Sequence, residues 1–499
     1  MAIGSITLEQ EPVDATDKIP AITNWNPVIG YMVKQSDISD LFYFKLILEV
    51  YTGTSAIAAN LIGKLKQRRN GYSVDITNDR ARAFFDLRDI INTVLVDTVW
   101  DQNLSGQPFS TIHTLGANDD TELIYSANGD SKLGKTQISS IYVKAYQEYS
   151  EIATGTPSEY PSPTVNDTLY WLQASAPLFT ARNDEGEYLQ SAYFQKYQGS
   201  SATDLLLSDV EENAGDYNIG SVRRNYVQET DYHTVAFLND ATNFTSDIDW
   251  IGITYFNSSG VGIGNQQFIA NTVANGGIPP DDGSLADDGR LLYFGCGPQN
   301  LETSTVDAYN TSGGGTTVAG GAKPSNFTDW AFYRISGYNA SAALMTEYYY
   351  FVKQDGSCKG FKVRRLGWRN SVGGYDYFNF KMKSTQTLEI ERNNYNTLIG
   401  RFDGSRYSYN NTQRGITTRQ TTASLKETLQ TDWITEGDAR LLEKLIMSTD
   451  VYIIENVDTE FTEGVVITDK SFVKKTTSND KMIQYTIKIE YANPVNTNS

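Results

Sequence analysis

The stretch Phe361–Lys383, FKVRRLGWRNSVGGYDYFNFKMK, constrains the fold more than any other part of this chain. In its second half, Phe378, Phe380 and Met382 share one parity, and mostly polar residues occupy the positions between them. Alternation with a period of two is typical of a half-buried β-strand. The preceding Gly-Gly pair supplies a turn in which a positive φ costs little. The stretch therefore predicts a β-hairpin.

Similar alternation elsewhere predicts further strands. The strongest apolar run is Leu41–Tyr51, in which Phe42, Phe44, Leu46 and Leu48 share one face, as a sandwich strand requires. Asp167–Phe179 fits a short helix or a strand equally well. Other predicted strands are Ile138–Tyr149, Trp250–Asn257, Trp330–Ile335, Glu347–Val352, Val451–Ile454, Gly464–Thr468 and Gln484–Tyr491.

Two segments have helical periodicity. Asp79–Val96 carries an apolar stripe at i, i+3, i+4, i+7 and i+8 and can be capped by Asn78 or Asp79. Thr435–Met447 carries a leucine-rich stripe, and Thr435 with Asp438 approximates a capping box. The predicted fold class is mainly β with a few helices: a multidomain chain with β-sandwich-like sheets and two packed amphipathic helices.

A chain of 499 residues is long enough for several domains. Residues 1–20 are polar and contain two prolines, which indicates an N-terminal arm. We expect an N-terminal β-rich domain over residues 21–111 with helix 79–96, a loop-rich β middle domain over 112–350, and a C-terminal β domain over 351–499 with helix 435–447. Breaker-rich loops are predicted at Thr154–Pro163, Asn275–Arg290 and Thr311–Lys323.

Charge and composition exclude several classes of protein. Sixty acidic against 41 basic residues give a net charge of −19, which argues against a nucleic-acid-binding surface. The first ten residues lack the features of a secretory leader, and no apolar run reaches the length of a membrane span. Cys296 and Cys358 are too few for a disulfide framework, so free thiols in a reducing compartment are expected.

Residues that could carry chemistry are few, and each has a plainer interpretation. His113 and His233 lack ligand spacing, and no zinc, nucleophile-elbow or phosphate-loop motif is present. The acidic pairs at 281–282 and 287–288 could hold Ca²⁺, but they lack the spacing of a calcium loop. Gly260–Gly264 is interpreted as a turn. The basic cluster Lys64–Arg69 is interpreted as a solvated loop, with a contact to an acidic neighbour, or less readily to nucleic acid, as the alternatives. The sequence predicts a non-enzyme with no catalytic, metal or cofactor-binding residue and no cofactor.

The hairpin and the C-terminal segments resemble virion structural proteins of tailed bacteriophages that infect marine and gut Bacteroidetes-type hosts. These proteins combine a W-x-N-x-x-G-x-Y-D-x-F-x-F hairpin with a short helix and a terminal β-ribbon. The matching hairpin residues are Trp368, Asn370, Gly374, Tyr375, Asp376, Phe378 and Phe380, followed by the helix in Trp433–Ile454 and the ribbon in Val465–Ala492. The resemblance covers roughly the last 140 residues, is looser over Asn24–Trp100, and carries no catalytic motif.

The resemblance implies a structural role in a particle, in a tail ring, adaptor, hub or baseplate. It implies synthesis in the host cytoplasm, location in the virion tail, and contacts with copies of the same chain and with neighbouring tail or neck proteins. Such tail components usually form sixfold or twelvefold rings. The abundant tyrosine and tryptophan leave open a receptor-binding module for host-surface glycan, and a tail-associated depolymerase is a weaker third alternative.

Overall fold

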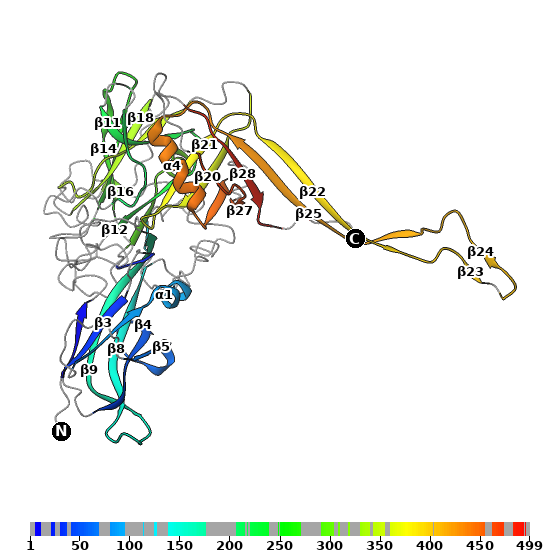
Figure 1. The fold of residues 1–499 in the computed structure, drawn as a ribbon. Helices are drawn as coiled ribbons and strands as arrows, with labels where there is room; N and C mark the ends of the chain where they lie inside the picture. Colours follow the sequence, from blue (N-terminus) through cyan, green and yellow to red (C-terminus); the bar gives the residue numbers. More distant parts are fainter. Residues whose placement is uncertain are drawn as a thin grey trace. The chain divides into compact units, whose positions relative to one another are not determined.

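The computed structural model describes residues 5–10, 21–24, 30–36, 41–68, 80–94, 113, 124–126, 138–175, 206–214, 217, 220–238, 248, 250–270, 291–303, 308–309, 318–319, 330–339, 343–354, 360–402, 404–454, 462–473, 483–493 and 495. The chain forms two compact units. The first comprises Met1–Lys353 and Asn370–Asp376, and the second Gln354–Arg369 and Tyr377–Ser499. Several sheets and few helices make up the fold (Figure 1), so the predicted fold class is confirmed.

The first unit contains a five-stranded sheet in the order β2-β9-β8-β4-β5. Its strands are β2 (Ala21–Asn24), β9 (Ser158–Ser175), β8 (Ile138–Ser150), β4 (Phe42–Thr52) and β5 (Leu61–Arg68). The predicted alternation of β4 is confirmed, because Phe44, Leu46, Leu48 and Val50 are buried. Phe42 is exposed and lies before a register shift in the β4–β8 pairing.

Three sequence predictions on this sheet are wrong or are now decided. Ser158–Pro163 belongs to strand β9, although its prolines indicated a loop. The ambiguous segment from Asp167 is a strand as far as Ser175. Lys64 and Lys66 lie on β5 and not in a loop, because their strand pairs with β4.

A second, three-stranded sheet has the order β1-β3-β6. Its strands are β1 (Ile6–Gln10), β3 (Gly30–Ser36) and β6 (Arg80–Asp86). Part of the expected N-terminal arm is therefore a strand of the chain's own sheet. The predicted helix 79–96 is wrong in its first half, because Arg80–Asp86 is strand β6 and α1 spans Arg88–Val94. Ala81, Ala83 and Phe85 are buried with period two, and the Arg88 backbone N–H donates to Asp86 Oδ1 at the start of α1. The expected caps Asn78 and Asp79 lie outside the described residues.

The rest of the first unit is built on a six-stranded sheet ordered β10-β11-β19-β18-β13-β14. Its core is aromatic: the rings of Tyr333 and Phe351 stack at 4.8 Å, and both side chains are fully buried. The strands are β10 (Glu212–Ala214), β11 (Ser221–Val227), β19 (Tyr349–Lys353), β18 (Phe332–Tyr338), β13 (Trp250–Phe256) and β14 (Gly262–Ala270). The predicted turn is confirmed at Gly260, which has a φ of +74°, whereas Gly262–Gly264 belongs to β14.

Smaller elements complete this unit. They are the sheet β12-β15-β7 of β12 (Thr234–Leu238), β15 (Leu291–Gly295) and β7 (Ile124–Ser126), the pair β16 (Ala308–Tyr309) and β17 (Val318–Ala319), the 3₁₀ turn η1 (Ala58–Asn60) and helix α3 (Pro298–Thr303).

The second unit is a seven-stranded sheet ordered β21-β20-β26-β27-β28-β25-β22. The strands are β21 (Tyr375–Phe380), β20 (Arg364–Arg369), β26 (Val451–Ile454), β27 (Thr462–Ile467), β28 (Thr486–Tyr491), β25 (Ile416–Gln430) and β22 (Thr385–Asn396). The predicted hairpin is present, but β21 is buried on both faces: Tyr375, Tyr377 and Phe380 are buried, and Phe378 is only half-buried.

Helix α4 (Glu436–Met447) confirms the second helix prediction. Thr435 and Asp438 form the predicted capping box, in which the Asp438 N–H donates to Oγ1 of Thr435. Asp therefore fills the position that usually holds Glu or Gln. Leu441, Leu442 and Leu445 are buried, so the leucine stripe is the packing face.

The hairpin turn Asn370–Asp376 belongs to the first unit. Asn370 organises it, because its Oδ1 accepts from the backbone N–H of Gly374 at 2.8 Å and its Nδ2 donates to the Leu207 carbonyl at 3.0 Å. Gly373 has a φ of +94°, as the Gly-Gly pair predicted. A Cβ at Gly374 would lie 2.2 Å from the Leu207 carbonyl oxygen, so this position requires glycine.

Candidate interaction finger

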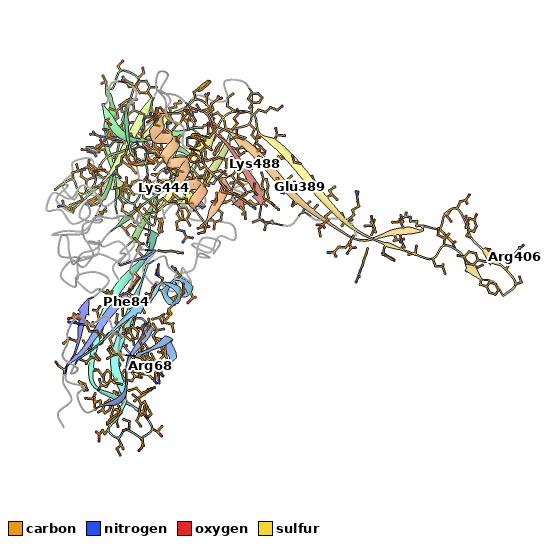
Figure 2. All side chains as sticks on the ribbon, viewed as in Figure 1. Arg68, Phe84, Glu389, Arg406, Lys444 and Lys488 are labelled. Carbon is orange, nitrogen blue, oxygen red and sulfur yellow. The ribbon has the colours of Figure 1, made fainter. Side chains whose placement is uncertain are left out.

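Within the second unit, β22 and β25 continue beyond the rest of the sheet as a two-stranded finger (Figure 1). They pair antiparallel from Thr385 opposite Thr428 to Asn396 opposite Ile416. Beyond them, β23 (Arg401–Phe402) pairs with β24 (Tyr407–Ser408). We call residues 385–430 the finger and residues 397–415 its tip. Figure 2 labels Glu389 on β22 and Arg406 in the tip.

Among the residues that the structure describes, no third strand pairs with the finger over most of its length. Only its base, Lys426–Gln430, pairs with β28, and β22 is the edge strand of the sheet. Every side chain of β22 is exposed among the residues that the structure describes. An isolated two-stranded hairpin is marginally stable at best in water. A finger of this length is therefore an element that another surface would stabilise.

The two faces of the finger differ in chemistry. Directly opposed residues of antiparallel strands share a face, so Leu388 with Leu425 and Ile390 with Ala423 form an apolar face. Leu388 and Ile390 are 50 % and 48 % exposed. The opposite face carries polar side chains from both strands: Thr385, Thr387, Glu389, Glu391, Thr422, Ser424, Lys426 and Thr428.

The face that carries Leu388 and Leu425 continues into the buried face of the sheet, with the polar pair Gln386 and Glu427 lying between the two. Leu429 has the same parity as Leu425, lies opposite Ile487 of β28, and is fully buried, as Ile487 is. Along β25 the same face therefore changes from core to solvent. A sheet face of this composition is normally covered by another layer of protein. In the finger, that layer is not supplied by the described part of the chain.

The finger concentrates the exposed apolar surface. Leu398 and Phe402 in the tip are 86 % and 69 % exposed. Of the 21 exposed large hydrophobic residues among the described positions, nine lie on the finger: Leu388, Ile390, Tyr395, Leu398, Ile399, Phe402, Tyr407, Tyr409 and Ile416. Single exposed hydrophobic residues need no explanation, but a cluster of them marks an interaction surface.

The charge of the finger is opposite to that of the chain. Residues 392–419, the distal half, contain five arginines and one aspartate, a net charge of +4. The whole chain carries −19, so the residues outside the distal half together carry −23. Arg401, Arg406 and Arg414 of the tip are exposed. The distal half therefore combines apolar side chains with the guanidinium groups that favour binding to carboxylates.

A buried polar cluster fixes the base of the finger. The Arg364 guanidinium donates to Glu427 Oε1 at 2.8 Å, and the Tyr491 hydroxyl donates to Glu427 Oε2 at 2.7 Å. Gln386 of β22 donates to the same carboxylate at 3.1 Å. Burial acts to raise the pKa of Glu427, but the hydrogen bonds from Tyr491 and Gln386 and the charge of Arg364 outweigh it and lower that pKa. The ionised carboxylate thus joins β20, β22, β25 and β28.

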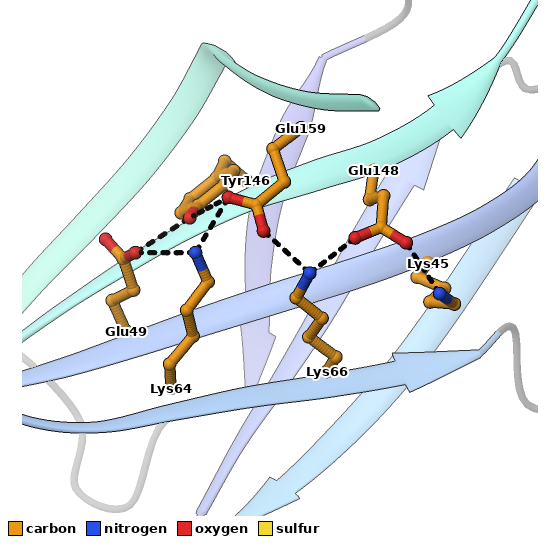
Figure 3. A network of polar contacts seen from close by, with 7 residues as sticks. All are labelled: Lys45, Glu49, Lys64, Lys66, Tyr146, Glu148 and Glu159. Atoms are coloured by element: carbon orange, nitrogen blue, oxygen red, sulfur yellow. Dashed lines mark hydrogen bonds and ion pairs between the residues drawn. The ribbon is translucent and has the colours of Figure 1, made fainter. Parts of the chain in front are cut away.

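A different polar network lies on the five-stranded sheet of the first unit, where four neighbouring strands place lysine and glutamate side chains in one row (Figure 3). Lys66 contacts Glu148 at 2.5 Å and Glu159 at 2.6 Å, and Lys45 contacts Glu148 at 2.5 Å. We call this row the ladder: Lys45, Glu49, Lys64, Lys66, Tyr146, Glu148 and Glu159. Lys64 and Lys66 of the basic cluster are therefore paired with carboxylates of the same chain.

The ladder shifts the acidity of its members. Hydrogen bonds from Lys64 and Lys66 lower the pKa of Glu159 to about 2. Hydrogen bonds from Lys45 and Lys66 lower the pKa of Glu148. Three lysines and three glutamates make the row electrically neutral. The charges of the ladder are paired within one chain, because each carboxylate has a lysine partner in the same sheet.

Two aspartates join the hairpin turn to the segment before β10. The Ser208 hydroxyl donates to Asp376 Oδ1 at 2.5 Å, and the Asp209 backbone N–H donates to Asp376 Oδ2 at 2.8 Å. Asp209 in turn accepts from the N–H and the hydroxyl of Ser371. Burial, and then the negative charge of Asp209, raises the pKa of Asp376 to about 7. These contacts give Asp376 of the sequence motif a structural role in holding the turn.

The two histidines are core residues. His113 and His233 are fully buried, and their rings pack edge-on against Tyr375 at 5.0 Å and Phe351 at 4.8 Å. The Cys296 thiol is buried, and its Sγ donates to the His233 carbonyl oxygen at 3.5 Å. No group of three or more potential metal ligands occurs among the residues that the structure describes.

Several predictions fall outside the described residues. They concern the acidic pairs at 281–282 and 287–288, the loop at 275–290, most of the loop at 311–323, and Cys358.

No protein-family model matches the sequence, and no curated protein matches it significantly. In the described parts of the chain, no helix is long and apolar enough to cross a membrane.

The finger was not predicted from the sequence. The short alternation Thr387–Ile390 is its only strand signal within β22, and the following Asn-, Thr- and Arg-rich residues are typical of loops. A more complete signal comes from two segments taken together. Leu388 and Ile390 alternate with polar residues in the first segment, and Ala423 and Leu425 do so in the second. The residues between the two segments include Gly400, Gly404 and Gly415. Such a pattern is that of a long hairpin with a glycine-rich tip.

Proposed function

We propose that this chain is a non-enzymatic structural component of a tailed-bacteriophage virion, a tail-assembly protein that works through protein–protein contacts. The finger carries the proposal. Its apolar face continues a core face into solvent, and its distal half has a charge opposite to that of the rest of the chain. Both properties belong to an element that is buried on assembly.

The assignment to a phage particle rests on the sequence resemblance. The turn residues that carry it, Asn370, Gly374 and Asp376, have structural duties here, since they close the hairpin and tie it to Leu207–Asp209. A ring, adaptor, hub or baseplate subunit would be made in the host cytoplasm and act in the virion tail. Its partners would be copies of itself and neighbouring tail or neck proteins.

The decisive experiment follows incorporation of the chain into particles. A variant in which an Asn-Gly turn replaces the tip closes β22 directly onto β25, because Asn396 and Ile416 are opposed. We expect normal folding by circular dichroism and loss of the variant from purified particles. A matched control replaces Thr387 and Thr422 of the polar face by Ser and should be incorporated normally. Incorporation of the tip-deleted chain at the wild-type level would contradict the assembly role of the finger.

A glycan-binding role is the second candidate, and the exposed aromatics of the tip favour it. Tyr407 and Tyr409 are exposed, and tyrosine rings stack on sugars. Binding of the full chain to a glycan array, lost in the tip-deleted variant, would support this candidate. A silent array together with self-association would support the assembly role.

A further inference from the structure

We propose that the finger binds a second copy of this chain, and that its positively charged distal half lies against an acidic surface of that copy. The inference rests on the proposed assembly function and adds the surfaces that meet and the orientation of the contact. We call the residues outside the finger the body. The contact is head to tail: the finger of one copy meets the body of the next.

The net charges favour a contact of the finger with the body of the second copy over a contact with its finger. Two distal halves of +4 each would repel one another, whereas the residues outside the distal half carry −23. Opposite potentials accelerate association and suppress the wrong orientation. A second copy thus offers the excess of carboxylates that the arginines favour. The same field disfavours a finger-to-finger pair.

The apolar face requires a protein as the partner. Exposed guanidinium groups can be neutralised by small ions, but Leu388, Ile390 and Leu398 gain only from losing contact with water. Full burial of one such side chain is worth about 1.5–3 kcal/mol. The finger therefore combines an electrostatic term that orients the copies with a hydrophobic term that holds them together.

The length of the finger favours the same arrangement. The twelve residues of β22 span about 40 Å at roughly 3.3 Å per residue, and the tip extends the reach further. A contact in which each finger meets the body of a different, third copy would be heterologous. Heterologous contacts close into rings or grow into filaments. Each copy would then donate one finger and accept one.

Charge reversal tests the electrostatic part. The triple variant Arg401→Glu, Arg406→Glu and Arg414→Glu is compared with Lys362→Glu, Arg440→Glu and Lys470→Glu, which changes the net charge equally at exposed positions outside the finger. Self-association of the full chain is measured by mass photometry and sedimentation velocity. We expect the finger variant to weaken association by about tenfold more than the control. The difference should shrink between about 0.1 M and 1 M salt, where the Debye length falls from about 10 to 3 Å. Equal weakening by both variants would overturn the inference.

Mixing tests the orientation. An affinity-tagged tip-deleted chain keeps its body, so it should retain untagged wild-type chain, whose finger it can still accept. The tagged triple variant should behave in the same way. If the contact were finger to finger, the tip-deleted chain would retain none, and the head-to-tail orientation would be wrong.

The two proposals fail differently. A wild-type chain that stays monomeric, together with loss of the tip-deleted chain from particles, would assign the finger to a different protein and overturn this inference alone. Self-association that depends on the tip, together with normal incorporation of the tip-deleted chain, would support this inference and contradict the role of the finger in the particle.

Discussion

The ladder and the finger are both solvent-facing parts of antiparallel sheets, yet they are built in opposite ways. In the ladder, Lys66 bridges Glu148 and Glu159, and each carboxylate of the row has a lysine of the same sheet beside it. On the finger, Leu388 and Ile390 face water, and the nearest residues on the opposing strand are also apolar. The ladder is complete within one chain, and the finger is not.

The comparison shows how the chemistry of a sheet face indicates its surroundings. A neutral row of paired charges loses little by facing water and would lose its hydration on burial. An apolar face loses by facing water and gains when another protein covers it. Substitutions in the ladder should therefore change stability without changing assembly, and substitutions on the finger should do the reverse.

The largest expected effect lies at the base of the finger, where a charge pair like those of the ladder is buried. Glu427→Ala leaves the buried Arg364 without its carboxylate and should lower the free energy of unfolding by about 3–5 kcal/mol. Denaturant unfolding measures the change. The double variant Arg364→Met with Glu427→Leu should recover much of the loss. A decrease in the free energy of unfolding of less than about 1 kcal/mol for Glu427→Ala would contradict this prediction, because it is the size expected of an exposed ion pair.

The stability contributed by the buried carboxyl group of Asp376 should depend on pH in the direction opposite to that of the ladder glutamates, whose pKa values are lowered. The pKa of Asp376 is about 7 in the folded chain and about 3.9 when unfolded, so the folded state holds the proton more tightly. The stability that this group contributes is fully present below about pH 4 and is lost as pH rises through 7. At about 1.4 kcal/mol per pKa unit, the loss is of order 4 kcal/mol. Asp376→Asn should remove this slope from unfolding curves measured between pH 4 and 8, and an unchanged slope would assign it to other groups.

On the finger, Leu388→Ser with Ile390→Ser should weaken self-association by roughly 100-fold, since about 3 kcal/mol of apolar burial is lost. The unfolding free energy of the monomer should change by less than about 0.5 kcal/mol, because both side chains are already half exposed. Mass photometry and thermal unfolding measure the two quantities. The control, Thr387→Ser with Thr422→Ser, alters the polar face and should change neither. A large loss of monomer stability would show that the chain itself covers these residues.

The fold was largely predictable where one periodicity dominates. Strand β4 and helix α4 follow their alternation and their capping box, because the burial pattern and the local signal agree. The helix predicted over 79–96 failed, since Arg80–Asp86 pairs with β3 and tertiary pairing overrides helix propensity. Strand β9 runs through prolines that indicated a loop, and its pairing with β8 outweighs that signal.

The finger was not predictable in the same way. Its strands are 12 and 15 residues long, but most of their residues are polar, and only Leu388, Ile390, Ala423 and Leu425 mark one face. The register that places these four together depends on both strands at once. Likewise, the sequence around Lys64 and Lys66 is typical of a solvated basic cluster. Their ion pairs with Glu148 and Glu159 depend on strands β8 and β9, which are distant in the sequence.

The smallest effect is expected in the ladder. Glu148→Gln removes the carboxylate shared by Lys45 and Lys66. Glu148 itself is buried, but both lysines are partly exposed, so water and salt screen the ion pairs and the cost should be about 1 kcal/mol. The pKa of Glu148 is lowered in the fold, so its contribution is present above about pH 4.3 and is lost as pH falls through the folded value. The difference between wild type and variant should shrink at high salt and at low pH, and self-association should be unchanged. Weakened self-association with little change in unfolding would instead make the ladder part of the surface that accepts the finger.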